Sequence, residues 1–294
     1  MFKLGVDLGG TKIEGIVLND ELNEVYRKRI ATEQQKGYMH IINNIAALYH
    51  DMAKQINLAP HTFGIGTPGS VSKYTGLLKN SNTTCLNEKS FLTDLENLVK
   101  RKVAIGNDAN CFVLAEALKG AGRNKQMVFG VIMGTGCGGG IVYDGKLIGG
   151  LQGIAGEWGH TSIDPNGPLC YCGKRGCVET FISGGGVENR YAELTGIKIP
   201  VEELIVRYRK KEKEAEEIIG AFFKHFGIAL SNVINILDPD VVVLGGGLSN
   251  IPEIYTFGIN EVQKNIFNDQ METLIVKNVC GDSAGVFGAA LTGV

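Results

Sequence analysis

The chain has 294 residues, of which 44% are hydrophobic and 20% are charged, and its formal net charge is −2. A chain of this length can bury a large core in one or two domains. The balanced charge gives no sign of a nucleic-acid partner, and no uninterrupted apolar run is long enough to predict a membrane span. The N-terminus lacks the apolar stretch and cleavage site of a signal peptide, so we expect a cytoplasmic protein.

The first part of the chain predicts two strands, then a helix, a strand and a second helix. Residues 2–6 and 13–18 have the apolar pattern of strands and flank a turn at residues 7–12. Residues 38–56 carry apolar side chains at helical spacing. A short strand at residues 103–105 leads through Asn107 and Asp108 into a helix at residues 109–118. Asn and Asp are common helix N-caps, and from spacing alone a cap and a functional pair both stay open.

The second part repeats the opening pattern. Residues 127–133 and 141–143 predict two strands around a glycine-rich turn at residues 134–140. The longest helical pattern, residues 214–237, is typical of a core helix, and the strand at residues 241–244 ends in three glycines before another helical pattern. The repeated strand, glycine turn and strand predict an α/β protein with mixed sheets in two related lobes. We expect the first lobe to cover residues 1–115, completed by a C-terminal helix at residues 281–294, and the second to cover residues 116–280.

The second glycine turn matches a known nucleotide motif only in part. Gly134, Gly136 and Gly139 fit G-x-G-x-x-G, the dinucleotide-binding pattern. That site needs a helix directly after the turn, because the helix N-terminus binds the pyrophosphate. A strand follows here, and the sequence G-x-x-x-x-G-K-[ST] of a P-loop does not occur. A Rossmann dehydrogenase is therefore a poor alternative.

A better interpretation is that a glycine turn from each lobe binds phosphate. Glycines let backbone N–H groups approach phosphate oxygens closely. Thr11 and Thr135 add hydroxyl donors, and Lys12 adds a positive charge. Asp7, at the end of the first strand, is placed to hold Mg²⁺ directly or through water. Two ordinary glycine hairpins would give the same pattern and remain an alternative.

The loop at residues 156–179 has metal-ligand spacing. One imidazole and three thiols lie in a stretch rich in Gly and Pro with little apolar surface to bury: His160, Cys170, Cys172 and Cys177. Cys₃His is a standard ligand set for structural Zn²⁺. Four protein ligands leave no open position for catalysis, and the flanking sequence is not basic, as a nucleic-acid-binding zinc ribbon would be. The other four cysteines occur singly, and we expect them to be small buried hydrophobic side chains or to have no specific role.

These motifs together resemble the ROK family of sugar kinases. The segments that carry the resemblance are Asp7-Leu8-Gly9-Gly10-Thr11-Lys12, Gly134-Thr135-Gly136-Cys137-Gly138-Gly139-Gly140, and the loop from His160 through Cys170-Tyr171-Cys172 to Cys177-Val178-Glu179. The resemblance runs from residue 2 to the last helix. It implies the sugar-kinase/actin-like fold, in which two ribonuclease-H-like lobes close on ATP and a sugar.

The resemblance also implies roles for individual residues. Asp108 is expected to be the general base. The expected sugar contacts are Asn107, Glu157, His160, Glu179 and Gly69. The residues expected on the side of ATP and Mg²⁺ are Asp7, Gly9, Gly10, Thr11, Lys12, Gly134, Thr135, Gly136 and Gly246. His160 is expected to bind structural Zn²⁺ through one ring nitrogen and to leave the other for the sugar.

The segment at residues 74–87 bears on the choice of sugar. Its Asn-x-Asn-x-Thr pattern, from Asn80 to Thr84, resembles bacterial ROK fructokinases, also called mannofructokinases. We therefore expect ATP-dependent phosphorylation of D-fructose to fructose 6-phosphate, with glucokinase, mannokinase and N-acetylhexosamine kinase as alternatives. A sugar sensor without catalysis would be expected to have lost Asp108 or a glycine turn, and a ROK repressor would carry a DNA-binding segment before the first strand. The resemblance implies a homodimer, and the charge balance and the lack of a long apolar run predict no nucleic-acid or membrane partner.

Overall fold

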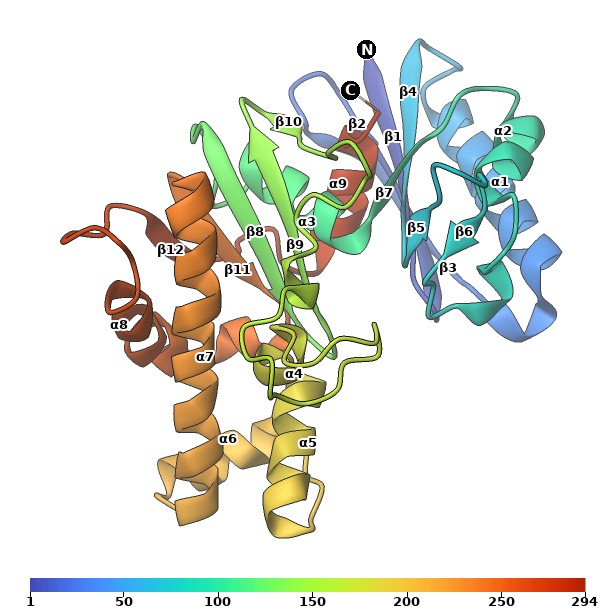
Figure 1. Ribbon diagram of the computed structural model, residues 1–294. Coiled ribbons are helices and arrows are strands. Elements are labelled where there is room, and N and C mark those ends of the chain that lie inside the picture. The colour runs from blue at the N-terminus through green and yellow to red at the C-terminus, as the bar shows by residue number, and fades with distance from the viewer. Residues whose placement is uncertain (294) are drawn as a thin grey trace. The chain divides into compact units, whose positions relative to one another are not determined.

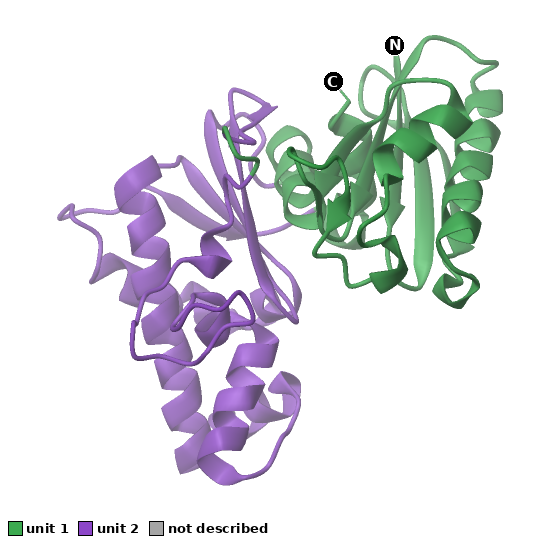
Figure 2. Cartoon of the chain, turned by 45° about the vertical axis from the view of Figure 1, so that its right-hand side comes forward, with its two compact units in different colours: residues 1–120, 151–153, 280–294 green, residues 121–150, 154–279 purple. Residues whose placement is uncertain are grey.

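The computed structural model describes residues 1–293 and divides into two compact units (Figure 2). Unit 1 consists of Met1–Gly120, Leu151–Gly153 and the chain from Cys280 onward, and unit 2 consists of Ala121–Gly150 and Ile154–Val279. The sequence placed a lobe boundary after residue 115, inside a helix that ends at Leu118. The whole of that helix packs within unit 1, so unit 1 ends after the helix and not inside it. Residue 294 of the predicted closing helix lies outside the described residues.

Unit 1 is built on a mixed sheet with the strand order β3-β2-β1-β4-β7 (Figure 1). Strand β1 is antiparallel to β2 and parallel to β4, which is parallel to β7. The strands and helices of this unit are β1 (Phe2–Leu8), β2 (Lys12–Leu18), β3 (Glu24–Ala31), α1 (Tyr38–Gln55), β4 (His61–Thr67), β5 (Ser70–Val71), β6 (Leu78–Lys79), α2 (Phe91–Val99), β7 (Ala104–Asn107), α3 (Asp108–Leu118) and α9 (Ala284–Leu291). Helices α1 and α2 contribute to one core with β1 and β4.

The C-terminal helix α9 completes unit 1 because small residues let it pack closely. It contacts α3, β1 and β4. A Cβ added to Gly5 of β1 would lie 2.3 Å from the backbone nitrogen of Ala290, and one added to Gly64 of β4 would lie 2.0 Å from the carbonyl oxygen of Ala289. A Cβ on Gly288 would lie 1.8 Å from the carbonyl oxygen of Cys111 in α3. The last helix of the chain is therefore fitted to strands formed by the first residues.

Unit 2 repeats the same sheet topology, with the strand order β10-β9-β8-β11-β12. Strand β8 is antiparallel to β9 and parallel to β11, which is parallel to β12. Its strands and helices are β8 (Met127–Met133), β9 (Cys137–Tyr143), β10 (Lys146–Leu147), α4 (Glu179–Ile182), α5 (Gly184–Thr195), α6 (Val201–Arg209), α7 (Lys213–Leu237), β11 (Val241–Gly245), α8 (Phe257–Gln263) and β12 (Leu274–Lys277). The predicted α/β class, with mixed sheets and an internal repeat, is confirmed.

The predicted glycine turn at residues 134–140 is too long. Only residues 134–136 turn, and Cys137 already begins β9. A Cβ added to Gly139 would lie 2.7 Å from Cδ1 of Trp158 and 2.8 Å from the carbonyl oxygen of Gly156. The glycines inside β9 thus let a following loop approach the strand closely, and they do not make the turn longer.

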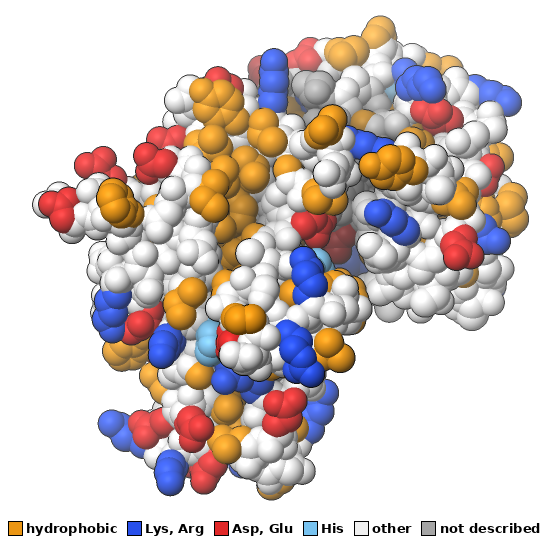
Figure 3. Space-filling view, viewed as in Figure 1, with side chains coloured by type: hydrophobic (Ala, Val, Ile, Leu, Met, Phe, Trp, Pro, Cys, Tyr) orange, Lys and Arg blue, Asp and Glu red, His pale blue; other side chains and the backbone are white. Residues whose placement is uncertain are grey.

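Helix α7 has the length and composition of a membrane-spanning helix, and among the described residues no other helix does. Its apolar side chains, including Phe222, Phe226 and Leu230, lie in the core of unit 2. A buried core helix has the same length and composition, which matches its interpretation from the sequence. On the face in Figure 3, acidic and basic side chains are interspersed, as expected from a net charge of −2.

Candidate functional site

Two acidic side chains lie at the carboxyl edge of the unit 1 sheet. Asp7 is near the end of β1, and Asp108 follows β7 as the first residue of α3. Strands β1, β4 and β7 are parallel neighbours, so their carboxyl ends share one edge. The pKa of Asp7 is raised to about 6, chiefly by burial and also by the charges of Asp108 and Glu14, while Lys12 acts to lower it. A bound divalent cation would offset the cost of keeping two carboxylates ionised at this edge, so the edge suits Mg²⁺.

The surroundings of Asp7 leave room for its carboxylate only because two neighbours are glycines. A Cβ added to Gly285 of α9 would lie 2.8 Å from Oδ2 of Asp7, and a Cβ added to Gly66 of β4 would lie 3.3 Å from Oδ1. Any side chain at Gly285 would displace the carboxylate. The fold therefore shapes a cradle around this acid.

Asn107 is the N-cap of α3. Its backbone is extended, with φ −81° and ψ 171°, and its Oδ1 accepts a hydrogen bond from the backbone N–H of Asn110 at 2.8 Å. The structural interpretation of this residue is confirmed. The cap also fixes the position of Asp108 at the start of the helix. A sugar contact through Asn107 stays a prediction.

The first predicted phosphate turn is a closed backbone turn between β1 and β2. The N–H of Gly9 donates to the carbonyl of Lys12 at 2.9 Å, and Thr32 fixes the turn through bonds to the carbonyls of Thr11, at 3.0 Å, and Gly9, at 2.7 Å. The side chain of Thr11 is exposed, and Gly10 has no atom closer than 3.9 Å to an added Cβ. This turn therefore has open space beside it.

Glu14 is a buried charge that the sequence interpretation missed. Its side chain in β2 is almost fully buried, and it accepts hydrogen bonds from Arg27 at 3.0 Å and from Arg29 at 3.0 and 2.9 Å. Lys12 Nζ lies 3.8 Å from the same carboxylate. Glu14 pairs in register with Arg29 of β3. The acidic residue within an apolar strand was visible in the sequence. The arginine that pairs with it could be identified only once the register of β2 and β3 was known.

Gly69 is required by the backbone of its loop. Its φ is +87°, and an added Cβ would lie 2.3 Å from the carbonyl oxygen of Lys79. The following segment is closed by the side chain of Asn87, which accepts from the N–H of Ser81 and donates to its carbonyl, both at 2.9 Å. The loop is thus ordered by its own contacts, and its approach to a sugar stays a prediction.

In unit 2, the second glycine turn meets the N-terminus of α5. The N–H of Gly184 donates to the carbonyl of Gly134 at 2.7 Å, and that of Gly185 to the carbonyl of Thr135 at 3.3 Å. Ser183 caps α5 by accepting from the N–H of Gly186 at 3.0 Å. A turn held at a helix N-terminus lies in a favourable electrostatic field for anions.

Two further predicted residues lie against this turn. Oε2 of Glu179 accepts a hydrogen bond from the N–H of Cys137 at 2.9 Å, and a Cβ added to Gly136 would lie 2.7 Å from that oxygen. Gly246 has φ +80°, and an added Cβ would lie 2.3 Å from the carbonyl oxygen of Met133, at the end of β8. The structure therefore brings Gly134–Gly136, Glu179 and Gly246 together at one edge of the unit 2 sheet.

The four predicted zinc ligands converge on one point. Their ligand atoms all lie within 4.8 Å of one another: His160, Cys170, Cys172 and Cys177. Nδ1 of His160 is 3.6 Å from Sγ of Cys170, and the thiols of Cys172 and Cys177 are 3.6 Å apart. Sulfurs bound to one tetrahedral Zn²⁺ at about 2.3 Å lie roughly 3.8 Å apart. The donor set and the spacing both fit a structural zinc ion.

The loop that carries these ligands is ordered by backbone bonds and glycines. Cys170 N–H donates to the carbonyl of Lys174 at 2.8 Å, and Gly173 N–H donates back to Cys170 at 2.9 Å. A Cβ on Gly176, which has φ +63°, would lie 1.6 Å from the carbonyl oxygen of Asp164. We call residues 160–177 the zinc loop.

The second ring nitrogen of His160 is not directed at the other predicted zinc ligands. Its Nε2 lies 2.9 Å from the hydroxyl of the exposed Tyr171. His160 ends a short 3₁₀ helix, Trp158–His160, whose N-cap is Glu157. Trp158 fixes that helix to β9 through a hydrogen bond from Nε1 to the carbonyl of Gly138 at 3.1 Å. Glu157 and His160 are therefore placed by one anchored turn.

Comparison with known proteins gives one consistent family. The sequence model of the ROK family matches residues 3–292. An N-acetyl-D-glucosamine kinase from Pasteurella multocida is 36% identical over 299 residues, covering 98% of both chains. A ROK hexokinase from Thermus thermophilus superposes with a TM-score of 0.91 at 29% identity, over 100% of this chain and 98% of that one. A ROK family glucokinase from Streptomyces griseus, solved with glucose and AMPPNP, has a TM-score of 0.74 at 25% identity, over 99% and 98%. These likenesses confirm the predicted actin-like sugar-kinase fold.

Proposed function

Because the chain belongs to the ROK family, we propose that it is an ATP-dependent kinase that phosphorylates N-acetyl-D-glucosamine. The observation that carries the chemistry is the acidic edge of unit 1, where the charge of Asp108 acts on the buried carboxylate of Asp7. A phosphoryl transfer needs a divalent cation on the phosphates and an acceptor for the hydroxyl proton. One acid of this pair can serve each need.

Asp108 is proposed as the general base. It would take the proton of the attacking sugar hydroxyl as the bond to the γ-phosphorus forms. The N-cap bond of Asn107 holds the start of α3, the turn that carries Asp108. Asp7 would bind Mg²⁺, which supplies charge neutralisation on the phosphate oxygens.

The nucleotide is proposed to use the glycine turns of both units. Backbone N–H groups and the hydroxyls of Thr11 and Thr135 would donate to phosphate oxygens. Lys12 adds a positive charge beside the first turn, and Gly246 borders the second. The S. griseus structure, with its bound AMPPNP, shows that a relative with this fold takes such a nucleotide.

The sugar hydroxyls are proposed to contact Asn107, Glu157, His160 and Glu179, with Gly69 in a bordering loop. Zn²⁺ would be held by His160 and the three cysteines, where it supplies a fixed shape for the zinc loop. This loop positions His160 directly, and Glu179 begins α4 two residues after Cys177.

N-acetyl-D-glucosamine replaces the fructose expected from the sequence. The fructokinase resemblance is not confirmed, since the P. multocida relative over the full chain is an N-acetyl-D-glucosamine kinase, which was among the alternatives. Glucose is the second candidate, because of the S. griseus glucokinase. A homodimer and a cytoplasmic location stay predictions.

A coupled assay of ADP release tests this proposal. We expect the highest kcat/KM with N-acetyl-D-glucosamine when N-acetyl-D-glucosamine, glucose, mannose and fructose are compared under the same ATP and Mg²⁺. A preference for fructose would restore the earlier prediction. Turnover with none of the four would contradict a hexose kinase.

A further inference from the structure

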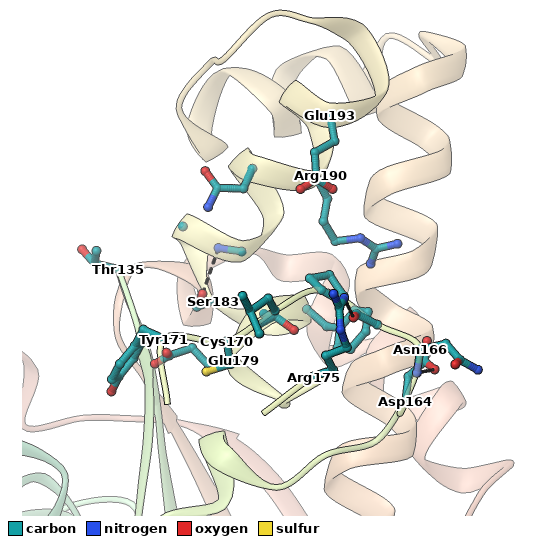
Figure 4. Close-up of a pocket in the computed structure, with 18 residues that line it drawn as sticks. Thr135, Asp164, Asn166, Cys170, Tyr171, Arg175, Glu179, Ser183, Arg190 and Glu193 are labelled. Carbon is teal, nitrogen blue, oxygen red and sulfur yellow. Dashed lines mark hydrogen bonds between the residues drawn. The ribbon is translucent and has the colours of Figure 1, made fainter. Parts of the chain in front are cut away.

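Unit 2 contains a cavity that the proposed reaction does not use in full. It measures about 840 Å³ and lies between the zinc loop and helix α5 (Figure 4). Thr135 and Glu179 line one end, beside the glycine turn. In Figure 4 the side chains of Arg175 and Arg190 enter from opposite walls, well away from Thr135. The sequence analysis gave these two arginines no role.

Arg190 is a half-buried cation with acidic groups nearby but no ion pair among the described residues. Its guanidinium lies over the ring of Phe181, 5.1 Å from the centroid, and that ring stacks on His225 at 4.0 Å. Among residues 1–293, none is within salt-bridge or hydrogen-bond distance of this guanidinium. Burial lowers the pKa of Arg190, although the acidic groups Glu193, Asp164 and Glu217 act to raise it. Its N–H donors are not used by the described residues and are open to an incoming acceptor such as a phosphate oxygen.

Arg175 lies on the opposite wall, with its backbone ordered by the zinc loop and its side chain exposed. It lies within the zinc loop, where its carbonyl accepts from the hydroxyl of Ser162 at 2.7 Å and its backbone bridges to Leu169. Its guanidinium donates one hydrogen bond, from Nη1 to the carbonyl of Gly167 at 3.3 Å. Its remaining N–H groups have no partner within the part of the chain that the structure describes. The zinc loop thus carries a second guanidinium beside the cavity, with one hydrogen bond to the loop backbone.

We propose that Arg175 and Arg190 bind the phosphate group of a phosphorylated sugar in this cavity. Guanidinium groups match phosphate oxygens with pairs of parallel hydrogen bonds. The wall also carries Asn166, Asn189 and Glu193, which suit sugar hydroxyls, beside apolar residues such as Leu169 and Phe181. Asp164 and Glu193 would repel a ligand that is anionic along its whole length, so a sugar with a single phosphate fits better than a nucleotide triphosphate.

The proposal depends on the proposed function only in one respect: the product of that reaction is one source of such a ligand. Other hexose phosphates share its chemistry. Inorganic phosphate would occupy the arginine end alone and make none of the contacts to hydroxyls. The affinity of the protein for these three kinds of probe therefore separates the sources.

Calorimetric titration of the full chain tests the proposal. N-acetyl-D-glucosamine and ADP are present at saturation, so that the substrate positions are filled. We expect N-acetyl-D-glucosamine 6-phosphate or glucose 6-phosphate to bind at one site per chain, at least about tenfold more tightly than inorganic phosphate. Arg190→Gln and, separately, Arg175→Gln should each weaken this binding by about tenfold or more, because each removes charge-assisted hydrogen bonds. Arg123→Gln, at an exposed arginine of the same unit, should leave it unchanged.

Three results would overturn the proposal: no binding of either sugar phosphate to the wild type, equal binding of inorganic phosphate, or unchanged affinity in both arginine variants. Thermal unfolding of each variant shows whether it is folded, and two separate arginines protect the test against one that is not. The titration requires no turnover. A protein that binds sugar phosphate through Arg190 but phosphorylates no hexose would refute the proposed function and leave this site standing, whereas an active kinase with no such binding would do the reverse.

Discussion

At the scale of single residues, Asp7 combines a structural cost with a chemical role. Its pKa is raised to about 6 from an ordinary value of 3.8, so the folded chain binds a proton there more readily than the unfolded chain. The metal-free protein should therefore gain stability as the pH falls from about 7 towards 4, with Asp7 as the source. A shift of this size corresponds to about 3 kcal/mol at pH 7.

Asp7→Asn should remove that cost. We expect the free energy of unfolding in the absence of Mg²⁺ to rise by roughly 1–3 kcal/mol at pH 7 and its pH dependence between 4 and 7 to flatten. Kinase activity should fall at the same time. Urea unfolding at several pH values measures the first effect, and Glu21→Gln, at an exposed acid of unit 1, is the control. An Asp7→Asn variant no more stable than the wild type at pH 7 would refute the account of this carboxylate.

At the scale of elements, the zinc loop depends on glycine geometry as well as on its ligands. Gly173 and Gly176 both have positive φ, +87° and +63°, but only Gly176 lies against backbone atoms. Gly173→Ala should cost about 1–2 kcal/mol through backbone strain alone. Gly176→Ala should cost clearly more, because its Cβ would overlap the carbonyl of Asp164. Equal stabilities of the two variants in thermal unfolding would show that the loop does not pack as described.

Metal content tests the same element independently. We expect about one zinc per chain in protein purified without chelators, and Cys172→Ser should lower both the zinc content and the melting temperature. Cys85→Ser, at a cysteine outside the cluster, should change neither. Full zinc content in the Cys172→Ser protein, measured by atomic emission, would argue against the four-ligand site.

The elements also show how far the sequence could be interpreted. Some strand and helix positions were predictable, because apolar periodicity marked β8 and α7 within a residue or two of their observed bounds. Others, such as β3, α2 and α6, were not identified from the sequence. The metal ligands were predictable because their spacing is local. The glycines of β9 were misplaced into a turn, since their packing against Trp158 depends on a contact across about 20 residues. The charge network of Glu14 and the cavity beside Arg190 could not be found for the same reason: each depends on partners fixed by tertiary structure.

At the scale of the whole molecule, the last helix packs against the first strand. Helix α9 fits against β1, β4 and α3 through glycines, so unit 1 is complete only when the last helix has formed. Gly288→Ala should destabilise the protein, because its Cβ would lie 1.8 Å from the carbonyl oxygen of Cys111.

Gly220→Ala in α7 is the matched variant. It also replaces a glycine inside a helix, but its added Cβ meets no atom within 4 Å. Its expected effect is a gain of up to about 1 kcal/mol. Melting temperatures that move in the same direction for both variants would contradict the close packing of α9.

The proposed kinase reaction can be followed by ³¹P NMR of phosphoryl transfer to N-acetyl-D-glucosamine, in the wild type and in Asp108→Asn. With ATP and Mg²⁺, the wild type should convert the sugar to its 6-phosphate and release ADP, and Asp108→Asn should lower kcat by about 10²–10⁴-fold. Asp94→Asn, which removes a carboxylate from the first turn of α2, should keep its rate. A wild type that forms no sugar phosphate, or an Asp108→Asn variant as fast as the wild type, would contradict the account.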